Sequence, residues 1–260
     1  MLPEQFPEHL PRSPLTLVVG QVRFAPILDI HEMIPQIQHR LRDLELPGYE
    51  EQRIQQLSIG PKIETDEVRR YVFGGKLKTE AVFLTDRFVV LAISMHDRFK
   101  TFSSRLQDIL DVVFEVAQPK YVEQTGLRYV NLLKELDEMT SDQMVVPALR
   151  GLTTEKLGCV STRSNSTIQA KTEHGQLTIR CLQLWGPAFL PPDLQIENME
   201  FPNRPEEGEE FRLLDIDHVS SGVAIELEDV QASMDSLHEF VRLGFLRSVT
   251  DQAISLWGKS

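Results

Sequence analysis

Two stretches far apart in the chain share one pattern, and this repetition strongly constrains the fold. The first reads VRFAPILDIHEM (22–33) and the second reads LRYVNLLKELDEM (127–139). Each places an arginine between an apolar and an aromatic residue, ends in an acidic residue followed by Met, and leads toward a helix. Such self-similarity is typical of an internal duplication, although two strand–helix junctions can also resemble each other by chance.

A duplication divides the 260 residues into parts with the same order of elements. Each half would contain a strand, a helix, several antiparallel strands and a long helix, which predicts an α+β architecture of the helix-grip or TATA-binding-protein-like kind. If the halves join through their first strands, they form one continuous curved sheet. We expect an N-terminal extended arm (1–13), a first repeat (14–119) and a second repeat (120–260) with a Pro- and acid-rich insertion (187–210).

Hydrophobic periodicity gives the individual elements of each half. Apolar residues at helical spacing predict helices at 28–44, 98–117, 141–150 and 231–257, with Pro147 weakening the third and Gly244 marking a bend in the last. Runs rich in β-branched and aromatic residues predict strands at 13–26, 52–60, 68–77, 80–94 with a turn at 85–87, 120–134, 157–170, 176–186, 211–219 and 222–228.

Composition and missing motifs exclude several common functions. The chain has 27 basic and 39 acidic residues, and this acidity disfavours nucleic acid as a partner. We expect no membrane segment, because apolar runs are too short, and a cytoplasmic protein with reduced Cys159 and Cys181. Phosphate-binding glycine loops, nucleophile elbows and H-E-x-x-H zinc motifs are all missing. The sequence therefore predicts no cofactor and no catalytic residue.

The arginines of the repeated pattern need partners. Strand alternation places Arg128 on one face with Gly126 and Val130, and an arginine among apolar neighbours requires a carboxylate or carbonyl. Glu123, Asp215 and Asp217 are candidates, so Arg23 and Arg128 are either members of structural ion pairs or arginines at a solvated edge of the sheet. The other interpretation is a site that grips an anionic ligand or a partner's carboxylate. Its residues would be Arg23, Arg128, Tyr129 and Asn131.

The stretch DIDH (215–218) carries a second candidate chemistry. Alternation puts Asp215 and Asp217 on one face, about 7 Å apart along the strand, and two such carboxylates can hold Mg²⁺ with waters. Glu226 of the next predicted strand could add a ligand. The alternative is a solvated charged face, with His218 as a hydrogen-bonded core histidine on the opposite face.

Three segments resemble a known family: the N-terminal Pro14 and Leu15 with a Gln-x-Arg-Phe first strand, a central Gly-Leu-Arg-Tyr-x-Asn, and a closing His-plus-helix segment. The residues are Pro14, Leu15, Gln21, Arg23, Phe24, Gly126, Leu127, Arg128, Tyr129, Asn131, His238, Thr250 and Trp257. The chain is similar to an uncharacterised, sporadically distributed prokaryotic family of hypothetical proteins of roughly this length. The resemblance implies no activity, and its sporadic distribution suggests a mobile or defence-associated locus.

These patterns favour a non-enzymatic binding or interaction protein that holds a partner protein or a small ligand in a groove of the duplicated sheet. One rival is a divalent-metal-dependent hydrolase or transferase centred on Asp215, Asp217 and Glu226. Another is an antitoxin-like partner of a neighbouring toxin. The sequence gives no prediction of oligomeric state.

Overall fold

One antiparallel sheet organises the α+β protein in the computed structural model, which describes residues 10–59, 63–96, 98–152, 158–159, 163–194, 196–220 and 225–259. The sheet has nine strands in the order β2-β3-β4-β5-β1-β6-β9-β8-β7. Their bounds are β1 Leu15–Phe24, β2 Gly48–Ile59, β3 Ile63–Gly74, β4 Glu80–Leu84, β5 Phe88–Ile93, β6 Val122–Lys134, β7 Asn165–Lys171, β8 Gly175–Trp185 and β9 Glu210–Ser220.

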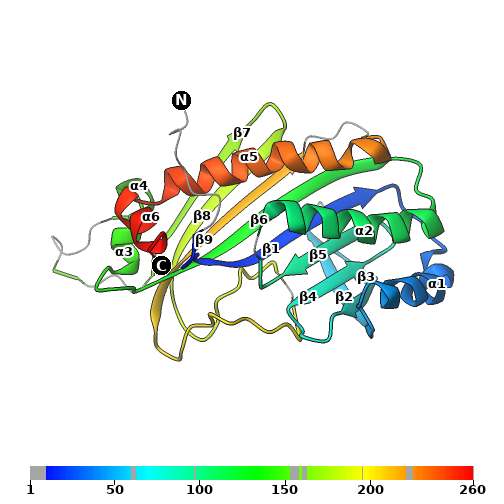
Figure 1. Ribbon diagram of the computed structural model, residues 1–260, viewed down its shortest axis with the longest axis horizontal. Helices are drawn as coiled ribbons and strands as arrows, with labels where there is room; N and C mark the ends of the chain where they lie inside the picture. The colour runs from blue at the N-terminus through cyan, green and yellow to red at the C-terminus, as the bar shows by residue number, and fades with distance from the viewer. Residues whose placement is uncertain are drawn as a thin grey trace.

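The centre of this sheet is the antiparallel pair of β1 and β6, which lie side by side in Figure 1. Val19 lies opposite Arg128, and Gln21 lies opposite Gly126. The two first strands of the predicted halves therefore do join into one continuous sheet. Strand alternation gives each of them one face toward the helices and one face away from them.

The helices pack on one face of the sheet, and their bounds are α1 Ile30–Asp43, α2 Phe99–Ala117, α3 Ser141–Met144, α4 Pro147–Arg150, α5 Val230–Ser248 and α6 Asp251–Trp257. Figure 1 shows the long helices α2 and α5 lying across the sheet. Gly20 of β1 lies under α2, where an added Cβ would meet the Phe102 ring at 2.9 Å. A side chain at position 20 would therefore force the Phe102 ring or the whole of α2 to shift. Among the described residues, no helix is long and apolar enough to span a membrane.

The opposite face of the sheet is covered by the connection between β8 and β9, residues 186–209, which we call the strap. Phe189, Met199 and Phe201 of the strap are buried in a second apolar cluster with β1, β4, β5, β6 and β9. The far end of the strap reaches the first half of the chain, because Glu200 N–H donates to the Lys78 carbonyl at 2.8 Å and the Ser94 hydroxyl donates to the Glu200 carbonyl at 2.6 Å. The strap, which the sequence predicts to be an insertion, thus forms a third layer in addition to the sheet and the helices.

The structure corrects several predicted boundaries. Pro147 divides the predicted helix 141–150 into α3 and α4, and the predicted helix 231–257 breaks at Val249 and Thr250 instead of bending at Gly244. The predicted strand 222–228 is wrong in its described part. There, Ile225 forms a single bridge with Val122, and a 3-10 turn follows at Leu227–Asp229.

The first described residues of the chain meet the C-terminal helix at one side of the sheet. Arg12 N–H donates to the Trp257 carbonyl at 3.0 Å, and the Arg12 guanidinium donates to the Asp137 carboxylate at 2.6 Å. Most of the predicted arm (1–13) lies outside the described residues. Its described part is therefore fastened to the C-terminal helix and to the loop after β6.

Candidate functional site

The predicted ligand-binding residues lie on both faces of the sheet. Arg23 and Arg128 share the strap face with Val19 and Val130, whereas Tyr129 and Asn131 lie on the helix face. Asn131 is buried, and its side-chain amide donates to the Leu214 carbonyl at 3.1 Å. The four residues therefore lie in two separate environments, one on each face of the sheet.

Arg23 forms an ion pair at a partly exposed position. Its Nε lies 2.8 Å from Oε2 of Glu123, one of the predicted partners, without the angle of a hydrogen bond. The guanidinium carbon also lies 5.6 Å from the centre of the Phe88 ring. Exposed ion pairs of this kind contribute little to stability, so Arg23 is a surface contact of the sheet.

Arg128 lies in a network that we call the guanidinium cluster: Arg128, Arg180, Asp193 and Asp215. Arg128 Nε and Nη2 donate to the two carboxylate oxygens of Asp215 at 2.7 and 2.8 Å, and Nη1 and Nη2 donate to Asp193 at 2.7 and 3.0 Å. Arg180 Nε lies 3.0 Å from Asp215 Oδ2. Burial by itself would lower the pKa of Arg128, but the hydrogen bonds to both carboxylates raise it. Arg128 is thus a largely buried cation that is bound by two carboxylates.

The predicted metal ligands are not brought together. Asp215 is fully buried and binds guanidinium groups, and burial raises the pKa of Asp217. Glu226 is exposed at the turn before α5. The part of the chain that the structure describes contains no group of three or more His, Cys, Asp or Glu side chains able to hold a metal ion.

His218 behaves as the sequence predicts for a core histidine. It is fully buried, with Nε2 2.9 Å from the Thr172 hydroxyl and Nδ1 3.3 Å from the Leu237 carbonyl. Burial lowers the pKa of this imidazole. It therefore fastens α5 to the hairpin of β7 and β8.

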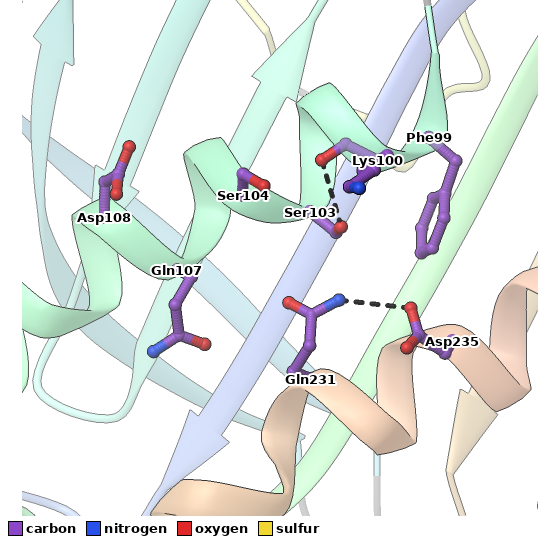
Figure 2. Close-up of a pocket in the computed structure, with 8 residues that line it drawn as sticks. All are labelled: Phe99, Lys100, Ser103, Ser104, Gln107, Asp108, Gln231 and Asp235. Atoms are coloured by element: carbon purple, nitrogen blue, oxygen red, sulfur yellow. Dashed lines mark hydrogen bonds between the residues drawn. The ribbon is translucent and has the colours of Figure 1, made fainter.

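A groove of about 580 Å³ runs between α2 and α5 on the helix face. In Figure 2, Gln107 of α2 and Gln231 of α5 point into the space between the helices. The Gln231 amide donates to Asp235 at 3.1 Å, and the Gln107 amide donates to Asp111 at 2.7 Å. These bonds fix each amide group, so the walls present ordered polar groups. The lining residues are Phe99, Lys100, Ser103, Ser104, Gln107, Asp108, Gln231 and Asp235.

An aromatic cluster lies at the Phe99 end of this groove. The His238 ring of α5 stacks on Phe99, with centroids 3.8 Å apart and planes 1° apart. Tyr129 of β6 lies beneath, with its ring centroid 6.0 Å from His238 and 5.9 Å from His96. Tyr129 is 9% exposed, and its hydroxyl has no hydrogen-bond partner among the described residues. An unpaired buried hydroxyl is costly in a protein interior.

No family model matches the chain. A comparison with curated proteins also finds no match. The resemblance to a prokaryotic family therefore stays a prediction, and the candidate site depends on the geometry alone.

A groove of the duplicated sheet was predicted, but none of the residues that line this one was among the predicted site residues, although one signal was present. Ser103 and Gln107 are four residues apart, as are Gln231 and Asp235, so each pair lies on one helix face. Such polar stripes are typical of any solvated helix surface. The sequence could not show that the two stripes face each other, because this depends on the β1–β6 pairing.

We expect His238 to make the protein less stable in acid. Burial lowers its pKa from 6.5 to about 4, with smaller contributions from Arg242 and His96. The unfolded chain therefore takes up the proton first, so stability is complete above pH 6.5 and is lost as the pH falls toward 4. Urea unfolding across this range measures the effect.

The control is His238→Gln, which retains a polar side chain but does not titrate. The stability of the intact protein relative to the variant should fall as the pH decreases from 6.5 to 4, and His218 should not affect this difference because both proteins contain it. A difference that does not change with pH would contradict the prediction.

Proposed function

We propose that the protein is a non-enzymatic binding module, built from two α+β repeats, that holds a small polar ligand in the groove between α2 and α5. The repeats would be residues 14–119 and 120–260, with a helix-grip or TATA-binding-protein-like arrangement. The groove itself carries the proposal, because the fixed amide groups of Gln107 and Gln231 lie along its walls and the Phe99 ring lies at one end.

The strand order supports the duplication. On either side of the β1–β6 pair, β5, β4 and β3 correspond to β9, β8 and β7, and β2 is an addition to the first half. The long helices α2 and α5 correspond as well, each with 19 residues. The groove lies between these helices, and pockets for small ligands often occur at such interfaces between structural units.

The lining supports a small polar ligand. A volume of about 580 Å³ falls in the range typical of small-molecule sites. The Phe99 ring offers an apolar surface at one end, and the two glutamines and Asp235 offer acceptors along the walls. A ligand with a flat apolar part and N–H or O–H groups would match both features.

A screen of amino acids, nucleosides, sugars and short peptides would test the proposal, with native mass spectrometry and thermal unfolding as readouts. A true ligand should raise the unfolding temperature, and Ser104→Trp should abolish the rise by filling the groove. Thr101→Trp, on an exposed position of the same helix, is the matched control and should still bind. A ligand that binds both variants equally would place its site elsewhere.

Replacing Tyr129 by phenylalanine should stabilise the free protein by about 1 kcal/mol, because it removes a buried hydroxyl without a partner. The same change should leave the affinity of a ligand found in the screen unchanged, because Tyr129 is not among the residues that line the groove. Urea unfolding and calorimetry measure the two effects. Tyr121→Phe is the control, since Tyr121 is exposed and should change neither quantity. A loss of stability in Tyr129→Phe would show that the hydroxyl is paired in solution.

A further inference from the structure

We propose that Arg128 and Arg180 form a carboxylate-binding site that Asp193 of the strap fills, so that the strap is a lid held shut by its own tethered ligand. This inference concerns the face of the sheet opposite the groove. It does not depend on the proposed function.

The guanidinium cluster has one carboxylate that is fixed in the sheet and one that can move away with the strap. Asp215 is fully buried on β9 and binds Arg128 through both carboxylate oxygens. Asp193 is different, because its side chain is 51% exposed and it comes from the strap instead of the sheet. Asp193 also lies 3.6 Å from Arg180. The sheet therefore supplies two arginines and one permanent carboxylate, and the strap supplies the second carboxylate.

Arg128 requires this second carboxylate. Its Nη1 donates to Asp193 Oδ2 at 2.7 Å, and the described residues give this nitrogen no other hydrogen-bond acceptor. A guanidinium binds two carboxylates well when each takes a different edge of its planar fork. Without Asp193, two cations would face one directly bound carboxylate, in a partly buried site where charge is costly. The open site would thus attract a carboxylate from solution.

The strap presents Asp193 in a defined position. The residue follows two prolines, and Leu194 N–H donates to the Pro191 carbonyl at 2.9 Å, which closes a tight turn around it. A tethered group of this kind has a high effective concentration at its site. In the intact protein, Asp193 would therefore keep small carboxylates out of the site, and the strap would stay closed over the apolar face.

The test compares amide hydrogen exchange in the intact protein and in Asp193→Ala. We expect the Leu194 amide and its neighbours in the strap to exchange about tenfold faster in the variant, because charged hydrogen bonds are lost. Amides of α2 should keep their protection. Sodium acetate or formate should then restore part of the protection in the variant, because a free carboxylate again neutralises the two arginines and removes the charge cost of closing the strap over them. Sodium chloride at equal ionic strength should not.

Two further variants make the result decisive. Asp193→Asn should also loosen the strap, but acetate should not rescue it, because the amide still occupies the site. Glu207→Ala removes an exposed carboxylate of the same strap and should change nothing. Unchanged exchange in both Asp193 variants would overturn the proposal, and so would equal rescue by acetate and chloride. If Asp193→Ala unfolds completely, failure of acetate to restore folding counts against the carboxylate site.

Discussion

Replacing Asp215 by alanine should lower the free energy of unfolding by roughly 3–5 kcal/mol, as expected when one partner of a buried ion pair is removed. The carboxylate is fully buried and accepts two hydrogen bonds from Arg128, with Arg180 3.0 Å away. Its loss would leave two guanidinium groups beside an empty space. A change of this size is a large part of a typical domain's stability.

Urea unfolding measures this loss of free energy, and two variants serve as controls. Asp193→Ala removes the half-exposed carboxylate on the same arginine and should cost clearly less. The double variant Arg128→Met with Asp215→Leu should recover part of the stability, because apolar side chains can replace a buried ion pair. If Asp215→Ala cost no more than Asp193→Ala, the buried carboxylate would not be the anchor of the cluster.

Arg212→Ala should destabilise the protein by about 3–5 kcal/mol, the range typical of large-to-small changes in a core. Arg212 of β9 is 1% exposed and is among the largest fully buried side chains. Its guanidinium donates to Asp142 of α3 at 2.6 Å, to the Ser164 hydroxyl at 3.1 Å and to the Arg150 carbonyl at 3.2 Å. These bonds fasten α3, α4 and the start of β7 to the sheet.

The Arg212→Met variant separates packing from hydrogen bonding, because methionine fills much of the same space without the polar contacts. We expect it to lose about half as much stability as Arg212→Ala. Hydrogen exchange should also rise in residues 141–150 of both variants, before global unfolding. Equal protection of this segment in all three proteins would contradict the anchoring role.

The repeated pattern and simple periodicity were enough to predict much of the fold. The turn at 85–87, the helix at 98–117 and the joining of β1 to β6 are all confirmed. These features depend on local spacing or on the repeat itself, which a sequence displays directly. The prediction of one continuous helix at 231–257 was wrong. The apolar stripe in the sequence continues through Val249 and Thr250, but the helix breaks at these two residues.

The candidate sites were harder to predict, because they depend on contacts between distant segments. Asp215 was named as a possible partner of Arg128, and the structure places it there. Asp193 could not be predicted, because it lies in a proline-rich segment without the periodicity that indicates a strand or a helix. Arg212 was missed too, although alternation in FRLLDIDHV puts it on the same face as Leu214, Ile216 and His218.

The central pairing of β1 with β6 also has a consequence for how the chain folds. During synthesis, β1 can pair with β5 on one side, but its other edge stays bare until β6 is made, because β6 comes after α2. An apolar strand with a bare edge readily pairs with another chain, and contacts between distant segments form slowly. The nascent first half therefore passes through a stage in which aggregation competes with completion of the sheet.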